Sequence, residues 1–371
     1  MASGALTPTG FPPPGTTSRL HAVAPSTLHA DHRLGNPLPE HVAVVRALPG
    51  IGDMLCAIPA LRALRAALPR ARVTVVGTDR ARPVLERFPR YVDDLLAIPG
   101  FDDLADLEDY RQGSGDLPAF LAEASRHAFD LAIQLHGTGG MSNGLTLLLG
   151  ARIRAGTCPP GGFCPDPVRF VPLEHDLPEI RRLLRVLDIL GIPPQGEHLE
   201  FPVTAADRDL LGAMPAAASL RPGQYVVVHP GSSTDERRWP ARHFATMIGL
   251  LGALRLPVVL TGTAADRPVV REVAASSRTD TIDLGGRTTL GTLGALVEGA
   301  RLVLCNDTGV SHLAAALRVP SVVVFTGSEM ARWAPLATDI HRAIEPAPGL
   351  DGVEDVLAAT LSLLGGERRA A

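Results

Sequence analysis

The stretch that decides the fold runs from residue 42 to residue 77. It opens with the apolar run Val42-Ala43-Val44-Val45, turns at Gly50-Ile51-Gly52, and then shows helical spacing of apolar residues over 53–68. A second apolar run follows at 72–77. Two short β-branched runs joined by a turn and a helix predict a βαβ unit with parallel strands and a right-handed crossover.

The same alternation continues along the chain and divides it into two blocks. We expect a leader at 1–40, a first Rossmann-like domain at 41–200, a second at 201–348, and a C-terminal helix and tail at 349–371. Further strands are predicted at 94–98, 130–135, 225–228, 257–260, 281–284, 302–305 and 321–325. The fold class is therefore α/β, with two doubly wound domains that face each other.

The basic residues are unusual, because all 35 are arginine and the chain has no lysine. A Walker A lysine and a Schiff-base lysine are thereby excluded. Any cationic contact with phosphate has to come from arginine, a helix N-terminus or a metal. The net charge of −4 gives no basic excess of the kind typical of nucleic-acid binders, so we expect no nucleic-acid partner.

The four cysteines predict reduced thiols and a cytoplasmic location. Cys56, Cys158, Cys164 and Cys305 show no C-x-x-C spacing and form no zinc pattern with the histidines, so no metal site is expected. The N-terminus lacks the basic start and apolar core of a secretory signal. No apolar run approaches the roughly 18 residues that a membrane-spanning helix needs.

Ligands of open α/β sheets bind where the strands end, so the residues after each strand are the candidates for a site. In the first domain these are Gly50 and Gly52 with Asp53, and His136, which opens a glycine-rich loop. Asp53 either caps the helix or acts as a general base. We expect the helix N-terminus to lower its basicity.

In the second domain, three loops after strands carry hydroxyl, glycine and charged residues. The first holds Ser232 and Ser233 ahead of Arg237, which suits a diphosphate or else makes a polar surface loop. The second holds Asp266, which either binds a ribose hydroxyl or caps the next helix.

The third of these loops opens a helix. Asp307, Thr308 and Gly309 stand at its start, where exposed backbone amides would face a phosphate. His312 lies one turn further on, as a ligand contact or as a buried, hydrogen-bonded histidine. The three loops together suit a nucleotide diphosphate, with Asp53 of the first domain opposite.

Four segments resemble glycosyltransferase family 9, the ADP-heptose:lipopolysaccharide heptosyltransferases. Residues 50–64 are similar to its strand–GD–helix signature and residues 129–137 to its fourth-strand segment. Residues 229–240 resemble its phosphate loop and K-x-W-P element. Residues 306–316 are similar to the D-T-G-x-x-H-x-x-A-A motif, the most specific of the four.

The resemblance implies a GT-B fold, an inverting mechanism and no metal cofactor, with a nucleotide sugar, ADP-heptose, as co-substrate. It implies that Asp53 is the general base on the acceptor hydroxyl. The residues implied on the donor are Ser232, Ser233, Arg237, Asp266, Asp307, Thr308, Gly309 and His312. Gly50, Gly52 and His136 would line the acceptor side.

Two positions depart from the family pattern. Arg237 stands where the family usually has lysine, and the two side chains bind phosphate with different geometry. Asp266 stands near the place of a usual glutamate, and its shorter side chain indicates a weaker ribose contact or another donor.

The acceptor is left open by the sequence. It is lipopolysaccharide core, another glycan or glycolipid, or a small secondary metabolite. Candidate contacts for acidic sugars are Arg46, Arg62, Arg152 and Arg154, or else these are ordinary surface charges.

The competing functions are a non-catalytic nucleotide-sugar-binding protein and a nucleotide-sugar epimerase. An NAD oxidoreductase is disfavoured because Gly50 and Gly52 are not part of G-x-G-x-x-G. Only peripheral association with a membrane is compatible with the sequence.

Overall fold

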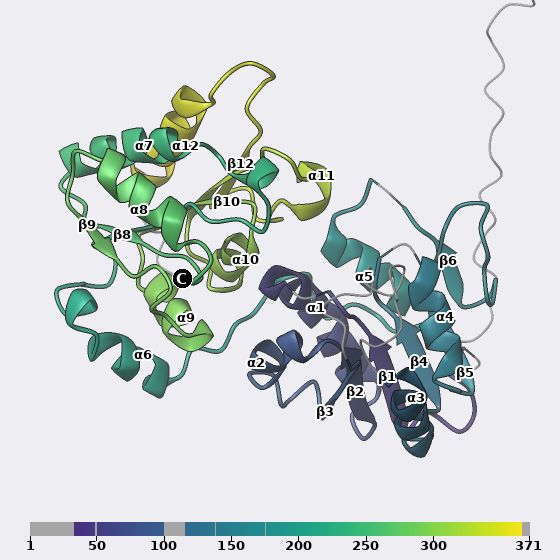
Figure 1. Ribbon diagram of the computed structural model, residues 1–371. Helices are drawn as coiled ribbons and strands as arrows, with labels where there is room; N and C mark the ends of the chain where they lie inside the picture. Colours follow the sequence, from purple (N-terminus) through teal and green to yellow (C-terminus); the bar gives the residue numbers. More distant parts are fainter. Residues whose placement is uncertain (1–32, 49, 100–115, 138, 175, 366–371) are drawn as a thin grey trace, which may run out of the picture.

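The computed structural model describes residues 33–48, 50–99, 116–137, 139–174 and 176–365. Most of the predicted leader and the last six residues lie outside this range. The chain forms two α/β domains, one purple to teal and one green to yellow in Figure 1.

The first domain is built on six parallel strands in the order β3-β2-β1-β4-β5-β6. The central strand β1 pairs on both sides, with Val44 opposite Val75 of β2 and Ile133 of β4. The strands are β1 (His41–Val45), β2 (Arg72–Gly77), β3 (Asp94–Ala97), β4 (Leu131–Gln134), β5 (Ile153–Cys158) and β6 (Phe170–Pro172).

The second domain repeats this design. Its six parallel strands run in the order β12-β11-β10-β7-β8-β9, which read from β9 is the 3-2-1-4-5-6 order of the first sheet. The strands are β7 (Val226–His229), β8 (Val258–Leu260), β9 (Thr281–Asp283), β10 (Leu302–Asn306), β11 (Ser321–Val324) and β12 (His341–Ile344). The predicted pair of doubly wound domains is confirmed.

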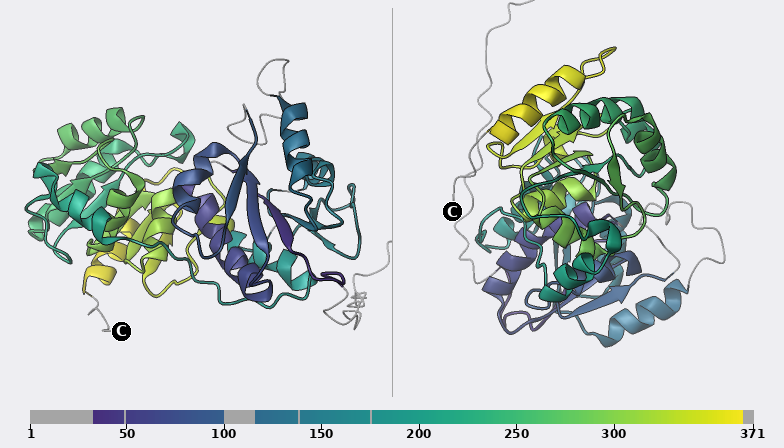
Figure 2. Two further views of the ribbon diagram at one scale, coloured as in Figure 1. Left: turned by 90° about the horizontal axis from the view of Figure 1, so that it is seen from below. Right: turned by 90° about the vertical axis from the view of Figure 1, so that its left-hand side faces the viewer.

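Helices cover both faces of each sheet. Those of the first domain are α1 (Ile51–Ala67), α2 (Arg82–Leu85), α3 (Leu117–Arg126), α4 (Gly140–Leu148) and α5 (Glu179–Ile189). The later helices are α6 (Ala205–Gly212), α7 (Ala241–Ala253), α8 (Arg267–Ser276), α9 (Leu290–Glu298), α10 (Gly309–Ala316), α11 (Met330–Trp333) and α12 (Val353–Gly365). The last helix packs on β11 and α7, and both views of Figure 2 show it, in yellow, on the second domain.

One apolar core runs through both domains. It joins Val42 and Val44 of the first sheet, through α1, to Val227 and Val303 of the second. Helix α1 packs on α5 of its own domain and on α10 of the other, so it is buried on nearly every side. The outer faces of the two sheets have separate cores, beneath α3 and α4 and beneath α7, α8 and α12.

Three strands were not predicted. Strand β5 has the sequence IRAGTC, with only two β-branched residues. Strands β6 and β12 are short edge strands with few β-branched residues. Such segments are strands because a neighbouring strand offers hydrogen bonds, and this tertiary cause leaves a weak local signal.

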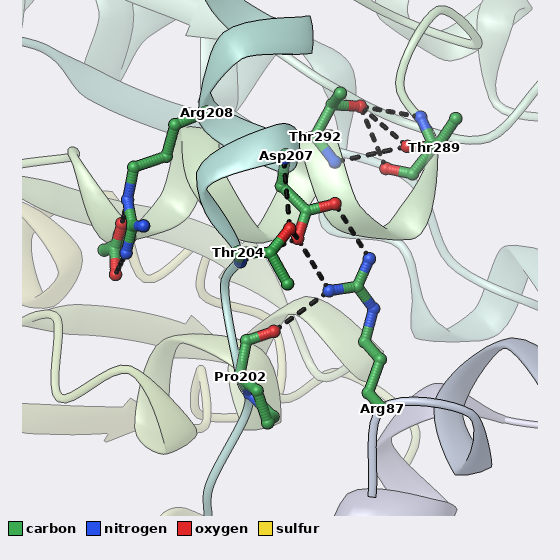
Figure 3. Close-up of polar contacts among 8 residues, drawn as sticks. Arg87, Pro202, Thr204, Asp207, Arg208, Thr289 and Thr292 are labelled. Carbon is green, nitrogen blue, oxygen red and sulfur yellow. Dashed lines mark hydrogen bonds and ion pairs between the residues drawn. The ribbon is translucent and has the colours of Figure 1, made fainter.

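Buried charge holds the linker between the domains, which is the segment 190–204 between α5 and α6. Arg87, just after α2, donates to both carboxylate oxygens of Asp207 on α6, at 2.8 and 2.9 Å, and to the carbonyl of Pro202 at 2.9 Å (Figure 3). Thr204 caps α6 in a reciprocal pair of hydrogen bonds with Asp207. The side chain of Asp207 is 10% exposed, and the hydrogen bonds from Arg87 hold its pKa well below the usual value.

Replacing Asp207 with Asn should lower the free energy of unfolding by about 2 kcal/mol at pH 7, because a charge-assisted pair is lost. The ionised carboxylate stabilises the fold above its unfolded pKa of about 3.9, and this contribution disappears as the pH falls toward the folded pKa. The difference between wild type and variant should therefore shrink below about pH 4.

Urea unfolding at several pH values measures this. The control is Asp209→Asn, an exposed position on the same helix, which should leave the unfolding free energy unchanged. A difference between wild type and Asp207→Asn that stays constant with pH would contradict the account.

Candidate functional site

The two domains meet where the first turn of α1 lies against the first turn of α10. A β-carbon placed on Gly52 would lie 2.3 Å from Cδ2 of His312. One placed on Gly309 would lie 3.1 Å from Cβ of Ile51 and 3.2 Å from the backbone nitrogen of Gly52. The two glycines therefore let two helix N-termini converge between the sheets, as Figure 1 shows for α1 and α10.

Asp53 lies at this convergence, as the third residue of α1. The N-cap position belongs to Gly50, and the Asp53 side chain reaches back over it: a β-carbon on Gly50 would lie 2.3 Å from Oδ2. The alternative that Asp53 caps the helix is therefore wrong. Burial raises the pKa of Asp53 above its usual value, against the opposing charges of Arg46 and His312. The expectation of lowered basicity is corrected, because desolvation outweighs the charges that stabilise the carboxylate.

The buried ion pair of Arg46 and Glu179 holds the backbone of Asp53 in place. The Arg46 side chain is fully buried, and its Nε donates to the backbone carbonyl of Asp53 at 2.8 Å. Its terminal nitrogens donate to the backbone carbonyl of Leu135 at 2.5 Å and to the carboxylate of Glu179 at 3.2 Å. Arg46 is therefore buried inside the first domain. The prediction that it is either a contact for an acidic acceptor sugar or an ordinary surface charge is wrong. Arg62 is also engaged, with Glu200 and three linker carbonyls.

His312 is enclosed at the same contact. Its Nδ1 lies 3.5 Å from Sγ of Cys56 on α1, and its ring meets the ring of Trp333 edge-on at 6.1 Å. Burial lowers the pKa of His312, which favours the neutral ring. The geometry fits the buried, hydrogen-bonded histidine, and a role in donor binding stays a prediction.

Unpartnered hydroxyls gather where the strands of the second domain end. Among the described residues, Oγ of Ser232, Oγ1 of Thr261, Oγ1 of Thr308 and Oγ of Ser328 are buried and make no hydrogen bond. They follow β7, β8, β10 and β11. A buried hydroxyl without a partner is costly, so this edge of the sheet suits a polar ligand that would bond them.

Asn306 holds the first of these loops in place. The side chain is fully buried, donates to the carbonyls of Pro230 and Gly231, and accepts from the backbone N–H of Trp239. Arg238 braces the same loop through the carbonyl of Ser232. Arg237 makes no such bond within the described part of the chain, so its guanidinium is available to a ligand.

The other predicted site residues take different positions. Ser233 is exposed and Asp307 is buried, directly after β10. Asp266 is buried under Gly231, and its Oδ2 accepts from the N–H and the hydroxyl of Thr263. It stands at the N-cap position of α8 without bonding the helix amides, and a ribose contact stays a prediction. His136 Nδ1 accepts from the N–H of Ala47 at the end of β1.

Metal-binding clusters and membrane-spanning helices are both absent from the described residues. No group of three or more His, Cys, Asp and Glu side chains there has the arrangement of a metal site. None of the described helices combines the length and apolar character needed to cross a bilayer. All four cysteines are free thiols, in agreement with the prediction.

Comparison with known proteins decides the family. The profile of "Glycosyltransferase family 9 (heptosyltransferase)" matches residues 123–347. The chain belongs to glycosyltransferase family 9. It is 24% identical over 291 residues to lipooligosaccharide heptosyltransferase 2 of Haemophilus ducreyi, covering 74% of this chain and 79% of that protein.

Solved structures place this member of family 9 in the GT-B fold. A family 9 glycosyltransferase from Veillonella parvula superposes with a TM-score of 0.72 at 22% identity, over 88% of this chain and 97% of that one. The Escherichia coli ADP-heptose lps heptosyltransferase II gives 0.69 at 21% identity, over 88% and 98%. The predicted GT-B fold is confirmed, and the protein is a glycosyltransferase.

The sequence analysis did not single out Glu179, Asn306, Ser328 or Thr78 as candidate residues. Thr78 and Ser328 follow β2 and β11, and each has a buried hydroxyl without a partner among the described residues. Reading every strand end for hydroxyls would have found both. Glu179 has no such signal, because its partners stand 133 and 153 positions away.

Replacing Gly52 with Ala should lower sugar transfer at least about tenfold, because the new methyl group would collide with His312 and separate α1 from α10. The fold should survive, since each domain keeps its own sheet. Steady-state transfer rates and thermal unfolding measure the two effects.

Gly144→Ala is the matched control. A β-carbon at this helical position meets no atom within 4 Å, so activity should be unchanged. Equal activities of the Gly52 and Gly144 variants would show that the contact between α1 and α10 has no part in the site.

Proposed function

We propose that this glycosyltransferase moves heptose from ADP-heptose to an acceptor hydroxyl with inversion at the anomeric carbon and without a metal cofactor. The observation that carries the proposal is the position of Asp53, a half-buried carboxylate at the point where α1 of one domain meets the first turn of α10 of the other. Base and diphosphate site would then stand on opposite sides of one cleft.

The donor would bind along the loops of the second domain. The hydroxyls of Ser232 and Thr308 have no hydrogen-bond partner among the described residues, and together with the N-terminal amides of α10 they would suit the oxygens of a diphosphate. Arg237 would add a positive charge on the departing ADP. Asp307 would hold hydroxyls of the sugar, and Ser233, Gly309 and Asp266 would complete the donor loops.

The reaction would proceed in one displacement. Asp53 takes the proton of the acceptor hydroxyl as its oxygen bonds to the anomeric carbon, and the bond from that carbon to the phosphate oxygen breaks. The negative charge passes to the ADP that leaves, where Arg237 and the N-terminus of α10 stabilise it. The raised pKa of Asp53 improves it as a base, provided that the pH lies above that value.

The acceptor would be a sugar of the lipopolysaccharide core. The named relatives supply this, since the Haemophilus ducreyi protein is a lipooligosaccharide heptosyltransferase and the Escherichia coli one is an lps heptosyltransferase. The acceptor side would be formed by loops of the first domain that carry Gly50, Gly52 and His136. We place the reaction in the cytoplasm, in line with the free thiols of all four cysteines.

The test is transfer from ADP-heptose to lipopolysaccharide core, with UDP-sugars as alternative donors. We expect consumption of ADP-heptose only, and only in the presence of acceptor. Asp53→Asn should lower kcat by about 10²–10⁴ because the base is lost, while calorimetry should show ADP binding within twofold of wild type.

The control is Asp188→Asn, an exposed carboxylate on α5 whose partner is Arg185, and it should transfer normally. Preference for a UDP-sugar would remove the ADP-heptose assignment and leave the fold and family untouched. Near-normal turnover of Asp53→Asn would remove Asp53 as the base.

A further inference from the structure

Glu179 connects the two domains through its two carboxylate oxygens. It is the first residue of α5, and its side chain is 3% exposed. Oε1 accepts from both terminal nitrogens of Arg46 at 3.2 Å, within the first domain. Oε2 accepts from Nε of Arg332 at 2.8 Å, on α11 of the second domain. Each oxygen therefore holds a guanidinium of a different domain.

Both guanidinium groups lead directly to the site. Arg46 donates to the carbonyl of Asp53 and so fixes the first turn of α1. Arg332 lies over the ring of Trp333 at 4.5 Å, and that ring meets His312. The carboxylate of Glu179 is thus linked through Arg46 to Asp53, and through Arg332 and Trp333 to His312 of α10.

The charged surroundings of Asp53 and Glu179 are shared. Asp53 is faced by Arg46, His312, Glu179 and Arg332. Glu179 also has Arg182 of its own helix at 3.7 Å, and its charge reaches the buried Cys56 thiol. Burial acts to raise the pKa of Glu179, but Arg46 and Arg332 outweigh it and keep the carboxylate ionised.

We propose that Glu179 is a positioning residue that couples closure of the two domains to the basicity of Asp53, an inference that rests on the proposed function of Asp53. Glu179 lies in the same domain as Asp53, so its negative charge is always near the base, and closure adds the positive charge of Arg332, which Glu179 binds. Opening removes Arg332 from Glu179 and from Asp53 together. The proton affinity of the base then depends on whether the second domain is in place.

Neutral replacements of the two partners should shift Asp53 in opposite directions. Glu179→Gln removes a negative charge and leaves Arg46 uncompensated, so the pKa of Asp53 should fall by about 0.5–1 unit. Arg332→Gln removes a positive charge and should raise it by a similar amount. A residue that only stabilises the fold would not produce opposite shifts.

The primary measurement is a ¹³C NMR titration of the Asp53 carboxyl in the full chain, assigned by its absence in Asp53→Asn. The secondary one is the pH profile of kcat, whose acidic limb should move the same way in each variant. The kcat of both variants should fall about tenfold at the optimum, with ADP affinity within twofold of wild type.

Arg185→Gln is the control, because this exposed arginine of α5 pairs with Glu174 and Asp188 instead. If Glu179→Gln does not fold, Arg332→Gln decides alone, since it leaves the Arg46–Glu179 pair intact. Shifts that are absent, or in the same direction for both variants, would overturn the inference. A wild type that transfers no heptose would overturn the proposed function, while the NMR titration would still decide the role of Glu179.

Discussion

The first turns of α1 and α10 approach each other so closely that a β-carbon would collide at Gly52 and would be tightly packed at Gly309. Gly52 and Gly309 satisfy this constraint, with His312 and Ile51 as the side chains that fill the remaining space. The continuous apolar core along α1 holds the two helices in this arrangement. Everything at the site follows from it, because the carboxylate of one domain comes to lie against the helix N-terminus of the other.

The close approach of the two helices removes charged side chains from water, and ion pairs among these side chains offset the cost. Arg46, Glu179 and His312 are buried at the contact, and Asp53 is half-buried there. Arg46 and Glu179 neutralise each other, and Arg332 supplies a further positive charge from the second domain. Asp53 makes no ion pair of its own among the described residues, so burial dominates its pKa. A base with raised proton affinity is the chemical result.

The second domain contributes hydrogen-bond donors to the site, whereas the first domain contributes the carboxylate of Asp53. Its loops after β7, β8, β10 and β11 hold buried hydroxyls that have no partner in the described part of the chain, and Asn306 fixes the loop after β7. Arg238 donates to the carbonyl of Ser232 within the loop, whereas Arg237 makes no hydrogen bond or ion pair among the described residues. The arrangement suits an anionic ligand on one domain and proton transfer on the other.

The sequence predicted the fold class and the loops of the site, because both depend on local pattern. Short β-branched runs marked β1, β2, β7 and β10, and the residues just after them are those that the sheets bring together. It did not predict β5, β6 and β12, whose strand character comes from their neighbours. Nor did it predict that Asp53 would have a raised pKa, that Arg46 would be buried, or that Glu179 would bind it. These depend on how the folded chain packs, for example on the contact between Arg46 and Glu179, which are 133 positions apart and leave no local signal.

A crystal structure of the chain with ADP bound tests the central claim most directly, because the claim is one of position. The account predicts that the diphosphate lies at the N-terminus of α10, within hydrogen-bonding distance of Ser232 Oγ and Thr308 Oγ1, with the Asp53 carboxylate across the cleft. ADP bound away from the contact of α1 and α10, with those two hydroxyls still unpaired, would contradict it.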